Sequence, residues 1–186
     1  PDHTSLASIP LPRLGYSGHI NERLDYGVLT HLACQHPEWS LVLVGGTYPW
    51  PPDAPPLQKL RSLPNVFFLG KYPYEDMAHI LHSMDVCLIP YVSDERGRYR
   101  SPLKLYEYLA AGKPVVSTPH PEAQEFGGYV YIGSDEKEFG RQVARALREE
   151  EPARQIERVQ LAREHSWDQR VNEMEALMWR HWPTRR

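Results

Sequence analysis

Apolar residues recur at two spacings along the chain, and their alternation predicts an α/β fold. Short, nearly unbroken apolar runs ending at glycine or proline are typical of buried parallel strands. Such runs are found at residues 13–18, 40–44, 65–69, 85–90, 114–118 and 129–132. Apolar residues three and four positions apart, with capping or breaking residues at the ends, predict helices between and after them. These are expected at residues 24–36, 57–63, 74–83, 101–111, 135–150, 152–165 and 166–179.

The order of these segments predicts a doubly wound, Rossmann-like parallel sheet with helices on both faces. A chain of 186 residues suits one domain, which we expect over residues 12–182. The first dozen residues carry three prolines and no initiating methionine, so residues 1–11 are expected to be a linker or the remnant of a missing N-terminal domain. Residues 183–186 are expected to form a tail.

The composition restricts which kinds of partner the protein can bind and in which cellular compartment it is expected. With 41% hydrophobic residues and a net charge of −3, the chain is globular and has no strong field to recruit nucleic acid or anionic lipid. No apolar run approaches the ~20 residues that span a bilayer. Cys34 and Cys87 lie in apolar-periodic segments and are expected to be buried, reduced thiols, which fits a cytoplasmic protein.

Ligands of such sheets bind outside the carboxyl ends of the strands, so the loops that follow strands are the first candidates. The first loop runs from Ser17 to Arg23 and contains Gly18. A glycine that leaves a strand lets the backbone approach a ligand, and Arg23 can pair with phosphate oxygens. The alternative is that Arg23 is an ordinary solvated surface residue.

A second candidate is the start of the helix at residues 101–111. Ser101 fits the N-cap and Pro102 the first helical position. Lys104 then lies in the first turn, where a cation opposes the helix dipole, and a bound anion would remove that conflict. Glu107, on the same helical face, can accept hydrogen bonds from sugar hydroxyls. Alternatively, Lys104 is a solvated lysine, or it pairs with Glu107 in a salt bridge.

The loop before this helix is rich in charge. Arg96, Arg98 and Arg100 beside a helix N-terminus suit a diphosphate. The alternative is a charged loop whose arginines are balanced by Asp94 and Glu95.

Other catalytic chemistry is not indicated. Ser117 has no neighbouring partner in the sequence to activate it, and no GxSxG motif is present. His79 and His82 are three residues apart, but we expect them on a helix surface rather than at a metal.

Several segments of the chain, taken together, resemble those of a known enzyme family. The segment SPLKLYEYLAAGKPVV, from Ser101 to Val116, resembles the signature of retaining glycosyltransferases of the GT-B fold, in the class called family 4. Five weaker segments support it in the right order. They are GYSGHINERLD, SLVLVGG, NVFFLGKYPYEDM, MDVCLIPY and HSWDQRVNEM. The resemblance covers the chain from about Pro12 to Met178 and implies one half of a GT-B fold, the C-terminal, donor-binding half.

The resemblance implies a nucleoside-diphosphate sugar as donor, with no metal or other cofactor. Lys104 and Arg23 match the family's phosphate-binding cations, which stabilise the leaving diphosphate, and Glu107 matches the glutamate that holds the donor ribose. The other implied donor-binding positions border the diphosphate, the base or the sugar. They are Gly18, His19, Gly70, Lys71, Tyr72, Tyr99, Ser101, Pro102 and Leu103.

Two departures from the family stand out. Many members carry a glutamate near the donor sugar where this chain has Tyr99; Asp94 or Glu95 could substitute for it. The acceptor-binding domain that precedes this segment in the family is absent, so the isolated domain is expected to be inactive. The last helix, which usually crosses to that domain, is then expected to expose apolar residues, unless they pack on this same domain. These residues are Trp167, Met174, Leu177, Met178, Trp179 and Trp182.

The expected function is the binding of the donor for transfer of a sugar to an acceptor hydroxyl with retention. The family implies polysaccharide or glycolipid assembly, with possible peripheral association of the full-length protein at the inner face of the membrane. A nucleotide-sugar epimerase of similar architecture, with acid–base residues shared between domains, is one alternative. A binding module without catalytic activity is the other.

Overall fold

A six-stranded parallel sheet forms the centre of the molecule. The computed structural model describes residues 4–47, 50–93, 103–148 and 151–181. In this part of the chain the strands run in the order β3-β2-β1-β4-β5-β6, and every pair is parallel. Their bounds are β1 (Arg13–Ser17), β2 (Ser40–Val44), β3 (Val66–Gly70), β4 (Val86–Ile89), β5 (Val115–Ser117) and β6 (Val130–Ile132). The expected doubly wound, Rossmann-like sheet is confirmed.

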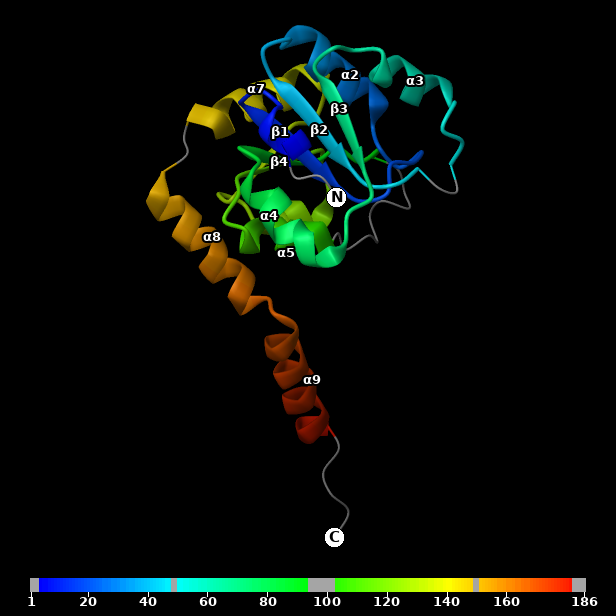
Figure 1. Ribbon diagram of the computed structural model, residues 1–186. Coiled ribbons are helices and arrows are strands. Elements are labelled where there is room, and N and C mark those ends of the chain that lie inside the picture. Colours follow the sequence, from blue (N-terminus) through cyan, green and yellow to red (C-terminus); the bar gives the residue numbers. More distant parts are fainter. Residues whose placement is uncertain (1–3, 48–49, 94–102, 149–150, 182–186) are drawn as a thin grey trace.

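Helices cover both faces of the sheet (Figure 1). The helices are α1 (Thr4–Ala7), α2 (Tyr26–Gln35), α3 (Pro55–Arg61), α4 (Met77–His82), α5 (Leu103–Ala110), α6 (Pro121–Glu125), α7 (Glu136–Arg148), α8 (Pro152–Glu164) and α9 (Trp167–His181), with a 3-10 turn η1 (Tyr74–Asp76) before α4. Buried residues of α2, α3 and α7 pack on one face of the sheet, and those of α4 and α5 on the other.

The strands are apolar on both faces because each face is covered by a helical layer. Leu41 and Leu43 of β2 belong to the core under α2 and α3, whereas Val42 and Val44 belong to the core under α4 and α5. This alternation follows from the two-residue period of a strand. It explains why the strands read as continuous apolar runs in the sequence.

Two expectations are corrected, and one further helix was not expected. Part of the expected linker at residues 1–11 instead packs on the domain: α1 forms there, and Leu6 and Ile9 are buried in the core under α4 and α5. The loop after β5 contains the short helix α6, which Pro121 begins. Cys87 is buried as expected, but Cys34 is exposed, because it points away from the buried face of α2.

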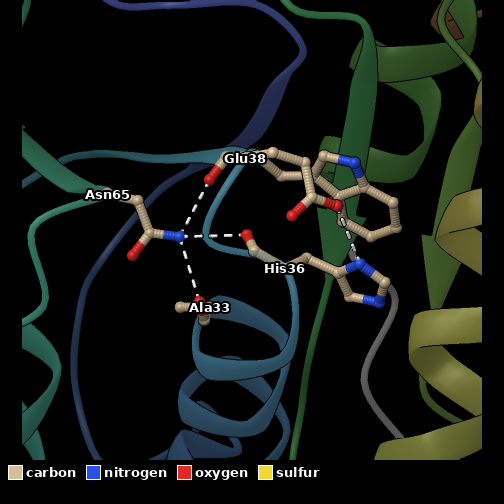
Figure 2. Close-up of polar contacts among 5 residues, drawn as sticks. Ala33, His36, Glu38 and Asn65 are labelled. Carbon is tan, nitrogen blue, oxygen red and sulfur yellow. Dashed lines mark hydrogen bonds and ion pairs between the residues drawn. The ribbon is translucent and has the colours of Figure 1, made fainter.

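Asn65 joins α2 to the start of β3 (Figure 2). The buried side-chain amide nitrogen of Asn65 donates hydrogen bonds to three backbone carbonyls. It lies 3.0 Å from that of Ala33, 3.2 Å from that of His36 and 2.9 Å from that of Trp39. Carbonyls at a helix C-terminus lack intrahelical partners, so the side chain supplies donors that the backbone does not. This contact holds the end of α2 against the sheet, just before β2 begins.

The last two helices extend from the body of the domain (Figure 1). α8 is held by Arg158, which is 1% exposed and donates a hydrogen bond to the Gly112 carbonyl at 2.9 Å. The start of α9 is held by Arg170, which donates to the Tyr106 hydroxyl at 2.7 Å. Beyond this point all residues of α9 are exposed. Trp167, Met174, Leu177, Met178 and Trp179 of α9 do not pack on the domain, so the alternative of packing on this same domain is not realised for them; Trp182 lies outside the described residues.

Candidate functional site

The candidate site lies at the carboxyl ends of β1 and β4, where the strand order reverses. From β1 the chain continues to β2 and β3 on one side, and β4 begins the series that runs to β6 on the other. The loops that leave two adjacent strands in opposite directions open a crevice at this place. The sheet therefore directs the search to the loops after β1, β2, β3 and β4, and to the start of α5.

Backbone hydrogen bonds tie the ends of β1, β2 and β3 together. The amide of Gly18 donates to the Val44 carbonyl at 2.8 Å, and the amide of Gly45 donates to the Gly70 carbonyl at 2.7 Å. A third bond runs from Ile20 to the Gly46 carbonyl at 3.0 Å. We call the three glycines of the loops after β1 and β2, Gly18, Gly45 and Gly46, the glycine shelf.

The shelf depends on the absence of side chains. Gly45 has φ +145°, and a Cβ there would lie 1.8 Å from the Gly18 carbonyl oxygen. A Cβ at Gly46 would lie 2.3 Å from Cε of Lys71, so the Lys71 side chain lies directly against Gly46. Glycine is therefore required at Gly45 for close approach and for the backbone conformation, whereas at Gly46 a side chain would displace the flexible end of Lys71.

Lys104 of α5 places its ammonium over the first glycine of the shelf. A Cβ at Gly18 would lie 2.8 Å from Lys104 Nζ. The same nitrogen lies 5.4 Å from the ring centre of Tyr16 and 5.6 Å from that of Tyr91. Within the described residues no carboxylate forms an ion pair with it, and the alternative salt bridge to Glu107 is not formed. Its positive charge thus faces the shelf uncompensated by these residues.

Tyr108 fixes α5 against the end of β1. The Ser17 amide donates to the Tyr108 hydroxyl at 2.8 Å, and Ser17 Oγ lies 3.2 Å from it. Burial raises the pKa of Tyr108 well above its ordinary value. Burial, reinforced by the Tyr91 phenol, also raises the pKa of Tyr16. These phenols stay neutral, so no phenolate offsets the charge of Lys104.

Glu107 lies one turn further along α5 and borders two grooves. It is half-buried. One groove, of about 530 Å³, lies between α5 and the junction of α8 and α9 and is also lined by Leu103, Trp167 and Arg170. The other, of about 260 Å³, lies between α4 and α5. Tyr74 borders both grooves, whereas Lys104 borders neither. The Glu107 carboxylate therefore belongs to the grooves, and the Lys104 ammonium belongs to the glycine shelf.

Some of the remaining expected residues lie within the described part of the chain, and the others lie outside it. His19, Arg23 and Lys71 are exposed, and Tyr72 is half-buried. The Arg23 backbone is fixed, since its carbonyl accepts from the Val92 amide at 3.0 Å beyond β4. Tyr99, Ser101 and Pro102 lie outside the described residues, as do Asp94, Glu95, Arg96, Arg98 and Arg100.

Four tyrosines border the site and were missed in the sequence. They are Tyr16, Tyr74, Tyr91 and Tyr108. Tyr16 and Tyr91 each stand at or just beyond the end of an apolar strand, which is the position where a ligand site is expected. Their position was the available signal, but their common contact with Lys104 becomes visible only when the strands are placed side by side.

Neither a metal cluster nor a membrane span is found in the described residues. No group of three histidine, cysteine, aspartate or glutamate side chains there is placed to hold a metal ion. His79 and His82 are exposed on α4, as expected. In the same part of the chain no helix has the length and apolarity needed to cross a bilayer.

Comparison with known proteins shows the family of this chain. Residues 12–149 match the family described as "Glycosyl transferases group 1". The chain is 36% identical over 123 residues to a putative teichuronic acid biosynthesis glycosyltransferase, TuaH, of Bacillus subtilis (strain 168). That alignment covers 63% of this chain and 30% of the relative, so the chain spans less than a third of the relative's length.

Solved structures show the same fold at low identity. Anabaena Alr3699/HepE in complex with UDP superposes with a TM-score of 0.71 at 16% identity, covering 93% of this chain and 50% of that one. The catalytic domain of cholesterol-alpha-glucosyltransferase from Helicobacter pylori superposes with a TM-score of 0.66 at 14% identity, covering 83% of this chain and 98% of that one. Since the family model covers well over half of the residues, this chain belongs to the glycosyl transferases group 1 family.

Proposed function

We propose that this chain is the donor-binding half of a family 4-like, retaining glycosyltransferase, which moves a sugar from a nucleoside-diphosphate sugar to an acceptor hydroxyl. One observation carries the proposal: the Lys104 ammonium lies over Gly18 at the strand crossover, without a carboxylate among the described residues to neutralise it. A diphosphate is the part of such a donor that this charge would bind. The UDP and UDP-glucose held by HepE make a uridine diphosphate donor the first to test.

The chemistry requires stabilisation of the leaving group. As the bond between the anomeric carbon and the phosphate oxygen breaks, its electron pair passes to the nucleoside diphosphate. The acceptor oxygen forms the new bond to carbon on the same face, and its proton passes to an oxygen of the departing diphosphate. Lys104 and Arg23 are the cations we assign to the growing negative charge, together with the positive end of the α5 dipole. In this proposal no metal is needed.

The amides of the shelf have a different role. Those of Gly18 and Gly45 are already engaged in hydrogen bonds between strands, so they do not donate to a ligand. The shelf instead provides a surface without side chains, over which a diphosphate can approach Lys104. Glu107, beside its two grooves, is the acceptor we assign to the ribose hydroxyls.

We propose that the acceptor is bound by a part of the protein beyond this chain, and that this domain alone does not transfer sugar. The chain spans 30% of TuaH and about half of HepE, which leaves room for an acceptor-binding domain in the whole protein. The exposed apolar residues of α9 would contact that domain. The name of TuaH, a putative teichuronic acid biosynthesis glycosyltransferase, supports a polysaccharide as the product, and we propose that it is assembled at the inner face of the membrane.

The test is calorimetric titration of this chain with UDP, GDP and ADP, with and without a chelator. We expect one of them to bind without metal and Lys104→Ala to weaken binding about tenfold or more, the effect of losing a hydrogen bond to a charged group. Lys113→Ala is the matched control, because Lys113 Nζ donates to the His82 carbonyl at 2.8 Å, at the other end of α5. Equal affinities of the two variants, or no binding of any diphosphate, would refute the proposal. Conversion of the donor sugar by the full-length protein without an acceptor would favour an epimerase.

A further inference from the structure

Lys104 is held by two aromatic rings rather than by an acid. Its Nζ lies 5.4 Å from the ring centre of Tyr16 and 5.6 Å from that of Tyr91. Both distances fall within the ~6 Å over which a ring face attracts a cation. The rings come from the end of β1 and from just beyond β4, so Lys104 lies above the boundary between the two halves of the sheet.

Both rings are held firmly. Tyr16 is 2% exposed, and its hydroxyl donates to the His19 carbonyl at 2.9 Å. Tyr91 is half-buried, its backbone bridges to Leu24, and its carbonyl accepts from Thr118 Oγ1 at 2.7 Å. The Tyr16 ring is therefore fixed by burial and by its hydroxyl, and the Tyr91 ring projects from a fixed backbone.

Rings and carboxylates hold a lysine with different consequences. A carboxylate within ion-pair distance would neutralise the ammonium and would repel an incoming diphosphate. A neutral ring attracts the ammonium through its quadrupole but carries no net charge. The lysine side chain also has four flexible bonds, and ordering it before binding removes part of the entropy that binding would otherwise lose.

We propose that Tyr16 and Tyr91 are positioning residues that hold the Lys104 ammonium over Gly18 in the free protein while leaving its charge available to the donor diphosphate. The proposal rests on the proposed function for its ligand, although the placement of Lys104 can be tested without any ligand. Gly18 belongs to the same arrangement, because a side chain there would meet Nζ.

The first experiment is a carbon–proton NMR spectrum of the ligand-free chain. Protons that lie over an aromatic ring are shifted upfield, so the ε-methylene signal of Lys104 should lie upfield of that of Lys113. Its loss in Lys104→Arg identifies the signal. Tyr91→Phe should keep the shift, since the ring remains, and Tyr91→Leu should move it toward the ordinary lysine position. An ordinary Lys104 signal in the wild-type chain would overturn the proposal, even if Tyr91→Leu did not fold.

The second experiment is the affinity for the diphosphate that the wild-type chain binds. We expect Tyr91→Leu to weaken binding about three- to fivefold and Tyr91→Phe to stay within about twofold of wild type, which is the scale of one cation–π contact. Unfolding curves of both variants check that the fold is kept. Equal binding by Tyr91→Leu and wild type would overturn the positioning role. If the wild-type chain binds no diphosphate, the proposed function fails, and the NMR shifts still decide how Lys104 is held.

Discussion

Replacing Gly45 by alanine should disrupt the glycine shelf at its tightest point. The new Cβ would lie 1.8 Å from the Gly18 carbonyl oxygen, and this obstacle is backbone that no rotamer change can move aside. Relief to about 3.0 Å requires the loops after β1 and β2 to separate by at least about 1 Å. That movement lengthens the two bonds that join these loops, the 2.8 Å bond from Gly18 to Val44 and the 3.0 Å bond from Ile20 to Gly46.

The expected loss of stability follows from these contacts. Two net hydrogen bonds contribute about 1 kcal/mol each. An alanine at φ +145° adds about 1–2 kcal/mol of backbone strain. We therefore expect Gly45→Ala to lower the free energy of unfolding by about 3–4 kcal/mol, or the melting temperature by roughly 10 °C for a chain of this size.

Urea unfolding followed by circular dichroism measures the effect, and an unchanged m-value shows that the compactness of both states is retained. Gly70→Ala is the matched control. Gly70 also has positive φ, +72°, but a Cβ there meets nothing within 4 Å, so the variant bears only a conformational penalty of about 1–2 kcal/mol. If Gly45→Ala is no less stable than Gly70→Ala, the argument from backbone approach is wrong.

Three further predictions concern the scaffold. Arg158→Met should lower the free energy of unfolding by about 2 kcal/mol, because a fully buried guanidinium that bonds the end of α5 is lost; thermal unfolding measures this, and a change under about 0.5 kcal/mol would contradict it. A thiol reagent should label Cys34 alone in the native chain and both cysteines after unfolding, since Cys87 is buried and burial raises its pKa to about 12. Asp135→Ala should lower the melting temperature at neutral pH but progressively less in acid. The hydrogen bond from the Glu138 amide lowers the pKa of Asp135, so its stabilisation is lost as pH falls through that value; a pH-independent difference would contradict this.

The order of strands and helices could be predicted because the apolar pattern is strong. In a sheet covered on both faces the central strands are buried on both sides, so each of them produces an apolar run that turns interrupt. The bounds of β2, residues 40–44, agree with the prediction. The short helices α1 and α6 were missed, since four or five residues beside prolines show no helical period.

Burial of single residues was harder to predict, because it depends on the rotation of a helix by a fraction of a turn. Cys34 follows the buried Ala33 on α2, and one step along a helix turns the side chain by about 100° into solvent.

Only those site residues that have a signal in the neighbouring sequence could be predicted. Lys104 and Gly18 were found because each has a local signal, a cation in the first turn of a helix and a glycine after a strand. Tyr16 and Tyr91 have only their position near strand ends as a signal, since their common contact with Lys104 joins residues far apart in the chain. A motif shows which residue carries the charge, whereas only the tertiary structure shows what holds that charge in place.

The glycine shelf has a consequence for how this domain can diversify. Its contacts run from amide to carbonyl, so three strand ends keep their spacing whatever side chains flank them. Substitutions at exposed neighbours such as His19 and Lys71 can then alter what is recognised beside the shelf without moving the surface beneath it. A fixed main chain bordered by exchangeable side chains lets selection change what binds beside it while the fold and its stability are conserved.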